Sequence, residues 1–379
     1  MKKQMSSSRA RKMTPPRIEP GDFPRLPLPL PIPYPPMEAT RSEQLPPGDD
    51  WQFEPKWDGF RALVFRHADQ VVLQSKSGQP LARYFPELVE EFRQLKQKSF
   101  VMDGEIVIPV DGRLSFDDLL MRIHPAASRI RKLSAETPAM YFAFDLLYQP
   151  AGKKKLLVGS PLQDRRKRLE DFFQKTPPGS SIRLSPATKD RKTAHQWFRK
   201  WGAVGLDGVI AKKINEPYHS GDRKGMIKVK NLKTADCVVG GYRYATGSRL
   251  IGSLLLGLYD SNGKLNHVGF TSSFSPEERK TLKQVIEPIR GGAGFSGRSP
   301  GGLSRWSTER SGEWEPIDPV LVCEVRYDYF SQGRFRHGTK FLRWRPEKKP
   351  KTCTLDQVLA TQNRGLKVPE FLKSVRHNH

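Results

Sequence analysis

The pattern of apolar residues changes near Asn231, and this change constrains the fold more than any other feature of the sequence. Before it, short runs rich in branched and aromatic residues (FRALVF, QVVLQS, FVMDGEIVI) alternate with helix-like stretches such as PELVEEFRQL. After it, strand follows strand with Gly and Asn-Gly turns and one helix-like stretch, SPEERKTLKQVIEPI. The first pattern indicates an α+β fold of antiparallel strands and helices. The second indicates a small β-barrel, for which an OB-fold is the natural choice.

We therefore expect two domains, which the length of 379 residues also favours. The expected parts are a basic disordered tail over 1–20, an α+β domain over 21–231, a barrel domain over 232–350 and a C-terminal tail over 351–379. Residues 24–36 read PRLPLPLPIPYPP, and so many prolines favour an extended polyproline conformation. The apolar side chains of this segment either lie across the body of the protein or recruit a partner, and we expect the first.

The charge of the chain points to a polyanionic partner. Lys and Arg number 65 against 40 Asp and Glu, which gives a net charge of +25 and a pI near 10. Because no amphipathic basic helix is evident, a nucleic acid is a better match than a membrane or an acidic protein. No apolar run approaches the roughly 20 residues that span a bilayer. Three scattered cysteines without a C-x-x-C pair argue against structural zinc and favour a reducing cytoplasm, where we expect a monomer.

The stretch EPKWDGFRALVF, from Glu54 to Phe65, raises a chemical question. Asp58-Gly59 between strand-like flanks predicts a tight hairpin, since glycine adopts positive φ at little cost. Such a hairpin needs neither Lys56 before the turn nor Arg61 after it. A lysine amine is ordinarily protonated at neutral pH, but neighbouring cations, burial or a metal can lower its pKa. Lys56 is therefore either a surface charge or a nucleophile.

Further motifs follow in a fixed order along the chain, and each of them has an ordinary structural explanation. An Asp-Gly-Glu turn, a buried AFDLLY strand and an edge strand with alternating lysines are common in proteins that catalyse nothing. Chance does not readily supply the whole ordered set. Its members after Lys56 are Asp103-Gly104-Glu105, Phe144, Asp207 to Lys212, and Lys228-Val229-Lys230.

In that order, the sequence resembles the covalent nucleotidyltransferases, which comprise ATP-dependent DNA ligases, RNA ligases and capping enzymes. The resemblance runs from about Pro36 to Lys349 and is greatest to the small bacterial ATP-dependent DNA ligases of the C type, which lack an N-terminal DNA-binding domain. It is carried by the runs EPKWDGFRALVF, RIHPAASR, FAFDLL, GLDGVIAK, IKVKN and FRHGTKFLRWRP. It implies a nucleotidyltransferase domain followed by an OB-fold domain.

The resemblance also implies a reaction and a set of site residues. Lys56 would attack the α-phosphate of ATP, and the AMP would pass to a 5′-phosphate at a break in duplex DNA, where the 3′-hydroxyl displaces it. Glu54 would contact adenine, Arg61 the ribose and Phe144 the face of the base. The remaining assignments are Glu105 and Asp207 to Mg²⁺ or Mn²⁺, Lys228 and Lys230 to the α-phosphate, and Arg345 and Lys348 to the leaving pyrophosphate.

Three positions depart from the family pattern. Lys76 stands in Ser75-Lys76-Ser77-Gly78 where an arginine is common, so the implied contact of Lys76 with the DNA 5′-phosphate loses the bidentate fork of arginine. Asp207 replaces a commoner glutamate, and Glu347 replaces a commoner aspartate.

Two other functions share parts of this pattern. An RNA ligase or capping enzyme would share the Lys56 chemistry, and a non-catalytic OB-type clamp would share the charge. We favour a DNA ligase that acts on nicks or ends in repair or end joining, with a repair polymerase or end-binding proteins as possible partners.

Overall fold

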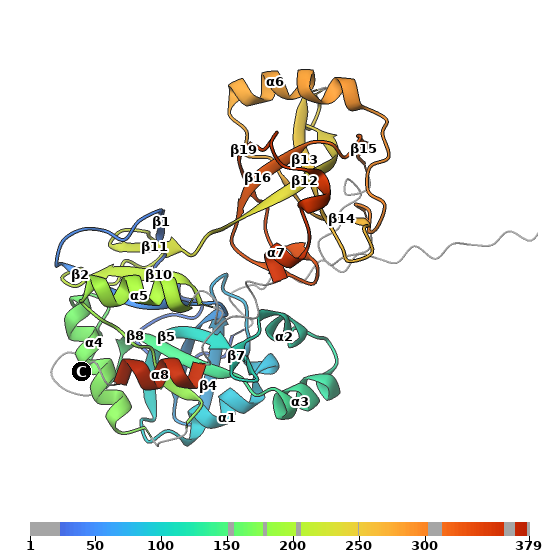
Figure 1. Ribbon diagram of the computed structural model, residues 1–379. Coiled ribbons are helices and arrows are strands. Elements are labelled where there is room, and N and C mark those ends of the chain that lie inside the picture. The colour runs from blue at the N-terminus through green and yellow to red at the C-terminus, as the bar shows by residue number, and fades with distance from the viewer. Residues whose placement is uncertain are drawn as a thin grey trace, which may run out of the picture.

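The computed structural model describes residues 23–150, 155–176, 180–201, 206–248, 250–301, 313–359 and 368–376. The basic tail expected over 1–20 lies outside these residues. One apolar core is built from residues between Ala235 and Val358, and the others are built from residues between Phe23 and Val229 together with Val368 and Phe371. Figure 1 shows the result, in which β12 (Lys233–Tyr244) leads from a mixed N-terminal domain into a strand-rich barrel domain.

Two sheets form the centre of the N-terminal domain. The first has the strand order β1, β11, β10, β2, and the second has the order β4, β3, β5, β8, β9. Within the described residues their pairings are antiparallel except for β1 with β11 and β8 with β9, which confirms the α+β expectation. The strands are β1 (Thr40–Ser42), β2 (Trp51–Trp57), β3 (Phe60–His67), β4 (Gln70–Ser75), β5 (Ser99–Val107), β8 (Met140–Tyr148), β9 (Ile182–Leu184), β10 (Leu206–Lys213) and β11 (Met226–Lys230).

Five helices of this domain pack around the sheets, and their ends follow local sequence signals. At the start of α2 the Asp118 N–H donates to the side chain of the N-cap residue Ser115 at 3.2 Å. At the start of α1, Pro86 occupies the first turn, where a missing N–H costs nothing. The helices are α1 (Pro86–Gln94), α2 (Phe116–Met121), α3 (Ala127–Glu136), α4 (Leu162–Gln174) and α5 (Arg191–Trp201), and a short hairpin of β6 (Pro109–Val110) and β7 (Arg113–Leu114) precedes α2.

The turn at Asp58-Gly59 does not form the predicted hairpin. β2, which ends before it, pairs with β10 in the first sheet, whereas β3, which begins after it, pairs with β4 and β5 in the second sheet. Gly59 is not among the residues with positive φ; instead, a Cβ at this position would lie 2.2 Å from the carbonyl oxygen of Ile106. The prediction of a hairpin was wrong because Gly59 serves close packing of the backbone, and the turn carries the chain from one sheet to the other.

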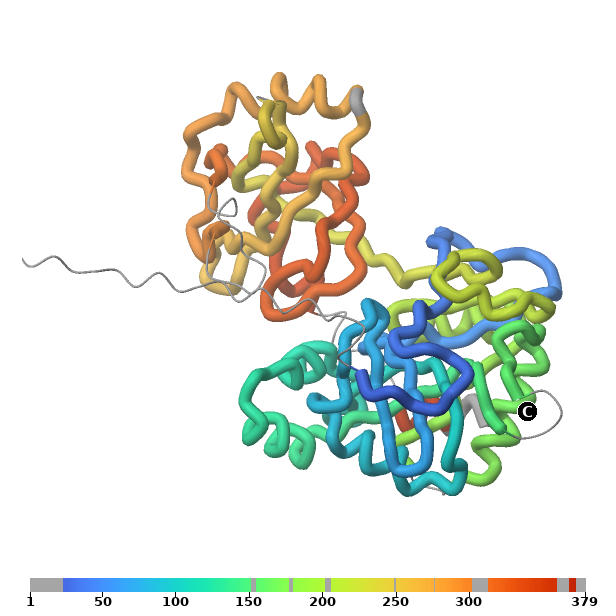
Figure 2. Tube along the Cα trace, turned by 180° about the vertical axis from the view of Figure 1, so that it is seen from behind, coloured from blue at the N-terminus to red at the C-terminus, as the bar shows by residue number. Residues whose placement is uncertain are grey.

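The proline-rich segment lies along the N-terminal domain, as the blue tube in Figure 2 shows. Its alternating apolar side chains pack into a cluster with strand residues such as Leu63 and Phe65. Tyr34 fixes its backbone, since the Tyr34 N–H donates to the Gln74 side chain at 2.7 Å and the Tyr34 carbonyl accepts from it at 2.7 Å. The apolar residues involved are Phe23, Leu26, Leu28, Leu30, Ile32, Tyr34 and Met37.

The barrel domain is a five-stranded barrel with the strand order β14, β13, β12, β16, β19. A parallel bridge between Thr271 and Thr339 joins its two edges, and the Thr339 N–H donates to the Phe270 carbonyl at 3.0 Å. This closure agrees with the predicted OB-fold. Its further elements are β13 (Ile251–Tyr259), β14 (Leu265–Thr271), β15 (Glu315–Pro316), β16 (Val322–Tyr327), β17 (Phe330–Ser331), β18 (Arg334–Phe335), β19 (Lys340–Trp344), α6 (Pro276–Ile286) and α7 (Asp356–Leu359). No helix among the described residues is both long and apolar enough to cross a membrane.

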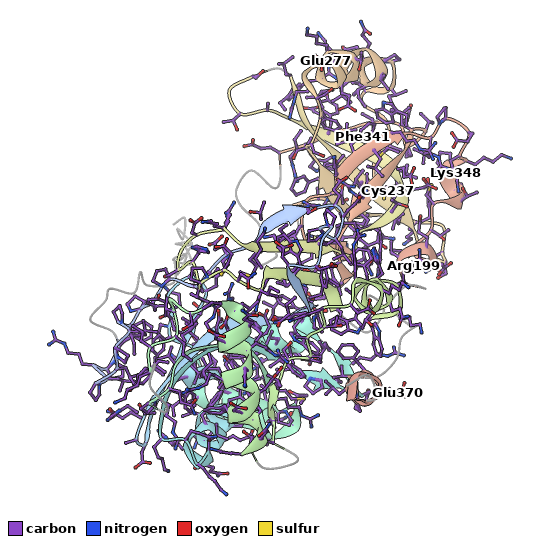
Figure 3. All side chains as sticks on the ribbon, turned by 90° about the vertical axis from the view of Figure 1, so that its left-hand side faces the viewer. Arg199, Cys237, Glu277, Phe341, Lys348 and Glu370 are labelled. Carbon is purple, nitrogen blue, oxygen red and sulfur yellow. The ribbon has the colours of Figure 1, made fainter. Side chains whose placement is uncertain are left out.

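The two described parts of the segment expected as a C-terminal tail over 351–379 are instead packed, one in each domain. Val358 of α7 is fully buried in the barrel core. α8 (Val368–Arg376) returns to the N-terminal domain, and Figure 3 shows its Glu370 there, whereas Lys348 lies on the barrel. The ring of Phe371 has its centre 4.3 Å from that of Trp201 and 5.9 Å from that of Trp57. An apolar face on α8 therefore makes this segment a packed helix.

We expect Phe371→Ala to release α8 from the N-terminal domain. Removing a buried phenylalanine ring costs about 3–5 kcal/mol, and Phe371 is the most deeply buried of the α8 side chains that the structure describes. Hydrogen exchange should therefore quicken in peptides from 51–57 and 191–201, which α8 covers. Leu359→Ala is the control because Leu359 is 42% exposed. Unchanged exchange in both peptides would contradict the docking.

Candidate active site

A cavity of about 980 Å³ lies in the N-terminal domain between its two sheets. Facing strands supply its lining in register: Glu54 of β2, Ile210 of β10 and Lys228 of β11 form one row across the first sheet. Residues two apart on a strand point to the same side, which is why the predicted residues converge. The charged and aromatic side chains that line the cavity include Glu54, Lys56, Arg61, Lys76, Glu105, Phe144, Lys212 and Lys228.

Lys56 is held in this cavity by an acidic partner. Its Nζ lies 2.8 Å from Asp207 Oδ2, and the same oxygen lies 3.3 Å from Lys230 Nζ. Burial disfavours the charged form of Lys56, but the carboxylates of Asp207 and Glu105 outweigh burial and raise its pKa above the ordinary value. Of the influences considered for this lysine, burial therefore acts towards a lower pKa, but it does not prevail over the two acids.

A β-bulge places Asp207 between the two lysines. Lys56, Gly208 and Lys230 face one another across three strands, and the register of β10 with β2 shifts between Leu206 and Gly208. Such a bulge re-aims a neighbouring side chain. Gly208 has φ of +150°, and a Cβ there would lie 2.0 Å from the Val229 carbonyl oxygen. Only glycine fits, and so the bulge and the shared carboxylate depend on it.

Glu105 is a second acid near Lys56. It lies opposite Arg61 in the register of β3 and β5. Burial raises the pKa of Glu105 to about 7, against the opposing effect of Lys56 and Arg61. No group of three or more His, Cys, Asp or Glu side chains that could hold a metal occurs in the described ranges. A divalent cation at Glu105 and Asp207 would therefore complete its ligands with water or phosphate oxygens.

The far end of the cavity has an aromatic face. Lys212 Nζ lies 4.4 Å from the centre of the Phe144 ring and 2.8 Å from Glu54 Oε2. Arg61 places its guanidinium carbon 5.4 Å from the same ring centre. The sequence analysis gave Lys212 no role, although it lies two residues after Ile210 and so on the same side of β10. This period of two was the signal that could have found it.

The cavity also concentrates positive charge. Burial, followed by the charges of Lys76, Lys56 and Lys230, lowers the pKa of Lys228. Positive charges that disfavour one another in a partly buried site are stabilised when an anion binds between them. Lys76 lies at the rim, 54% exposed, with its Nζ 3.4 Å from Glu38. The arrangement suits a ligand with an aromatic ring at one end and phosphates at the other.

Arg345 and Lys348 do not reach this cavity. Both bind Asp236 in the barrel domain, through contacts of 2.8 Å to Arg345 Nη1 and 3.2 Å to Lys348 Nζ. Different barrel residues contact the N-terminal domain. Asp328 Oδ2 lies 2.9 Å from Lys230 Nζ, and this ion pair, together with His337, lowers the pKa of Asp328 although burial acts the other way.

Arg336 makes a further contact between the domains. It donates two hydrogen bonds to Asp58, of 2.7 and 2.8 Å, and its guanidinium carbon lies 3.8 Å from the centre of the Phe116 ring. The sequence analysis assigned Asp58 only to its turn and gave Asp328 and Arg336 no role. Contacts between domains leave no local pattern in a sequence, so no signal for these two pairs was available.

Comparisons with known proteins give the cavity a context. Residues 36–230 match the family described as ATP dependent DNA ligase domain, and residues 247–348 match the ATP dependent DNA ligase C terminal region. The chain is 42% identical to DNA ligase C1 of Mycolicibacterium smegmatis over 341 residues, which are 87% of this chain and 95% of that protein. The chain belongs to the ATP-dependent DNA ligases.

Other relatives of this ligase agree in extent and fold. DNA ligase C of Mycobacterium tuberculosis is 42% identical over 346 residues, which are 87% of this chain and 95% of that protein. A solved structure described as a Lig E DNA ligase with a minimal DNA-binding scaffold superposes with a TM-score of 0.52 at 17% identity, over 82% of this chain and 99% of that chain. At this level of identity the likeness concerns the fold alone.

Gly59→Ala should disturb the backbone that positions this site. The added Cβ would collide with the Ile106 carbonyl, and the backbone between Lys56 and Arg61 would have to move. We expect a loss of roughly 1–3 kcal/mol of stability from overpacking, and a loss of DNA joining that exceeds what reduced stability explains. The measurements are thermal unfolding and nick joining, with Gly159→Ala as control because its Cβ meets nothing within 4 Å. Normal joining by Gly59→Ala would show that this close approach does not position the site.

Proposed function

We propose that this ligase seals breaks in duplex DNA through AMP carried on Lys56. The single observation that carries the proposal is the position of the Lys56 amine, which lies in the cavity 2.8 Å from Asp207. The cavity extends from this amine to the ring of Phe144. A nucleotide whose base stacks on Phe144 would present its α-phosphate to Lys56, because both side chains line the same space.

The residues at the aromatic end suit the nucleoside. Phe144 offers a ring face to the adenine, while Glu54 offers a carboxylate oxygen to its edge. Glu54 is 2% exposed and is held by Gln52 and Lys212 at 2.8 Å each, so its position is set before a ligand binds. Arg61 lies between this end and Glu105, where a ribose would lie.

Glu105 and Asp207 would hold the divalent cation, Mg²⁺ or Mn²⁺. The two carboxylates fit because they are hard oxygen donors on opposite sheets that both act on Lys56. When bound, the cation would supply positive charge at the phosphates and would neutralise the two carboxylates that raise the pKa of Lys56. The chain itself contributes by holding both carboxylates where they raise the pKa of Lys56.

Lys228 and Lys230 would stabilise the α-phosphate as charge develops on it. The Lys56 amine forms a bond to phosphorus, and the bond from phosphorus to the pyrophosphate oxygen breaks. The 5′-phosphate of the break then displaces Lys56 from the AMP. Attack by the 3′-hydroxyl on this phosphate releases AMP and joins the strand, which leaves Lys56 as a free amine.

Lys76 would contact the DNA 5′-phosphate, because its side chain is 54% exposed whereas the other cavity lysines are buried or half-buried. Duplex DNA with nicks or ends is the proposed substrate, and a monomer suffices for the reaction. A repair context is supported by a relative named multifunctional non-homologous end joining protein LigD, of Mycobacterium bovis. It is 31% identical over 307 residues, which are 79% of this chain and 37% of that protein.

Lys56→Ala should abolish the covalent AMP adduct and leave DNA binding intact. Among the described amines, only Lys230 shares Asp207 with Lys56, and Lys230 is also bound by Asp328. The measurement is labelling of the protein by α-labelled ATP, followed by a chase with nicked duplex. Lys132→Ala, at a lysine 72% exposed on α3, should label normally. A labelled Lys56→Ala protein would move the nucleophile elsewhere.

Arg345→Ala should lose self-adenylation and still seal a nick that already carries 5′-AMP. Pyrophosphate leaves on the side opposite Lys56, and cations must stabilise its charge. Lys228 and Lys230 of the N-terminal domain are already assigned to the α-phosphate. Arg345 and Lys348 can serve it only if the barrel turns about 231–236 and releases them from Asp236.

The matched control is Arg343→Ala, since Arg343 is 61% exposed and binds only Glu324 in the described structure. It should charge and seal normally. If Arg345→Ala charged normally and failed on the pre-adenylated nick, Arg345 would be a DNA contact and the proposed barrel rotation would be wrong.

A further inference from the structure

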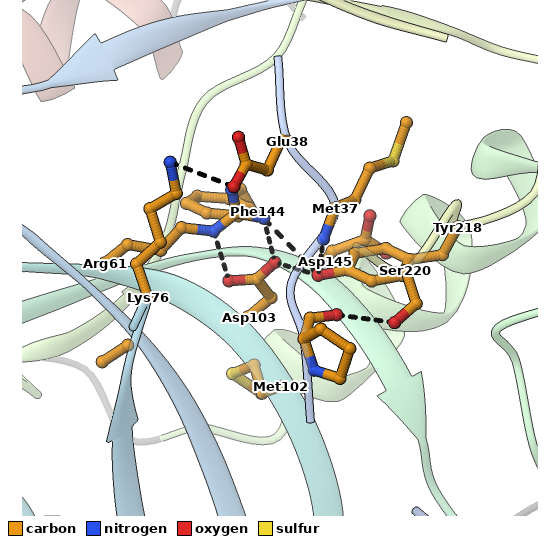
Figure 4. Close-up of polar contacts among 12 residues, drawn as sticks. Met37, Glu38, Arg61, Lys76, Met102, Asp103, Phe144, Asp145, Tyr218 and Ser220 are labelled. Carbon is orange, nitrogen blue, oxygen red and sulfur yellow. Dashed lines mark hydrogen bonds and ion pairs between the residues drawn. The ribbon is translucent and has the colours of Figure 1, made fainter. Parts of the chain in front are cut away.

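Behind Arg61, away from the cavity, lies a chain of hydrogen bonds that begins in the proline-rich segment (Figure 4). The backbone N–H of Met37 donates to the Tyr218 hydroxyl at 2.9 Å, and that hydroxyl donates to Asp103 Oδ2 at 2.7 Å. Asp103 accepts a bidentate pair from Arg61, at 3.0 Å from Nε and 2.6 Å from Nη2. Three residues from three different segments thus end on Arg61, the arginine assigned to the ribose.

Burial makes each bond in this chain costly to lose. Asp103 is fully buried and Tyr218 is 4% exposed, so neither can exchange its partner for water. Burial, and then the charge of Asp103, raises the pKa of Tyr218 well above the ordinary value. The hydroxyl therefore keeps its proton at physiological pH. With the Met37 N–H occupying one of its lone pairs, it has Asp103 as the acceptor for that proton.

Tyr218 and Asp103 do not line the cavity, whereas Arg61 does. Asp103 engages Nε and Nη2 of Arg61, and Nη1 has no hydrogen-bond partner among the described residues. A guanidinium held at two of its nitrogens is restricted in rotation, so its remaining nitrogen keeps one direction.

The proline-rich segment holds the Met37 N–H in place. The Ser220 hydroxyl donates to the Pro35 carbonyl at 2.6 Å, and the Glu38 N–H donates to the Asp222 carbonyl at 2.7 Å. These contacts lie on both sides of Met37, and Met37 itself is buried in the same apolar cluster as Tyr218. The segment therefore fixes the donor as well as covering the sheet.

We propose that Tyr218 is a positioning residue for Arg61, that it acts through Asp103 and through a direct hydrogen bond of 3.4 Å from Arg61 Nη2, and that the backbone of Met37 sets its hydroxyl. This inference rests on the proposed role of Arg61 in nucleotide binding. It makes the proline-rich segment part of the nucleotide site, although most of that segment is remote from the cavity. Its consequence is that ATP recognition, rather than the later steps on DNA, depends on the segment's docking.

Tyr218→Phe tests the inference, because it removes the hydroxyl and keeps the ring. The full chain is assayed for its initial rate of self-adenylation against ATP concentration. We expect the half-saturating ATP concentration to rise roughly three- to tenfold, the range set by one hydrogen bond, with the maximal rate changed less than twofold. Tyr34→Phe is the control, since Tyr34 packs in the same apolar cluster and only its backbone is bonded. It should not alter either value.

A double-mutant cycle separates positioning from general loosening. Arg61→Ala should raise the half-saturating ATP concentration, and Tyr218→Phe added to Arg61→Ala should raise it no further. An equal effect of Tyr218→Phe with and without Arg61, or no effect of Tyr218→Phe alone, would overturn the inference. If Arg61→Ala itself had no effect, the proposed role of Arg61 would fail instead. If Tyr218→Phe does not fold, Met37→Pro, which deletes the N–H donor, replaces it in the same cycle.

Discussion

The carboxylate of Asp207, shared by Lys56 and Lys230, is the interaction on which the site depends. Two ammonium groups from different strands are brought to one acid because a β-bulge at Gly208 turns that acid between them. The three side chains are only 11–22% exposed, and pairing offsets the cost of holding their charges there. The same carboxylate contributes to the raised pKa of Lys56. In the proposed reaction, the ligands that bring the substrate also remove the acids that hold the lysine proton.

The same ion network reaches the barrel domain. Asp328 binds Lys230, one of the two lysines proposed for the α-phosphate, while Arg336 binds Asp58 next to the Lys56 strand. In this position of the barrel, Arg345 and Lys348 are committed to Asp236. A phosphate that takes Lys230 would compete directly with Asp328 and weaken one of the described attachments between the domains. Nucleotide binding and barrel position would then be linked by exchange of partners, with no need for a separate signal.

Local patterns in the sequence predicted the elements well and their assembly less well. The Ser115 cap, the AFDLLY strand and the closed barrel could be predicted because period, caps and turns are local. The division of the strands into two sheets could not be predicted. The strands on either side of Gly59 would have the same composition whether they paired with each other or belonged to separate sheets. The site residues predicted in the N-terminal domain lie in or beside one cavity, whereas Arg345 and Lys348 lie on the barrel. Asp103 was named only as part of its motif and Tyr218 not at all, since the two are 115 residues apart and meet only in the fold. Helix α8 could have been predicted, because the apolar residues Val368, Phe371 and Leu372 have helical spacing.

Except for its last residue, Pro36, the proline-rich segment lies outside the ranges matched by the ligase families, which are 36–230 and 247–348, and so does α8. Each nevertheless packs behind one part of the cavity. In the proposed arrangement Met37, the residue after the proline-rich segment, supports Arg61 through Tyr218. α8 packs against Trp57, the residue after Lys56, whose ring stacks on Phe142 with centres 3.9 Å apart. Trp57 and Phe142 belong to an apolar core to which both sheets contribute, and α8 adds Val368 and Phe371 to that core. The proposed nucleophile and the proposed ribose contact are on different sheets, and their separation sets whether one nucleotide can touch both. The proline-rich segment, which packs against the second sheet, and α8, which packs against the shared core, thus help to fix the spacing on which the proposed reaction depends.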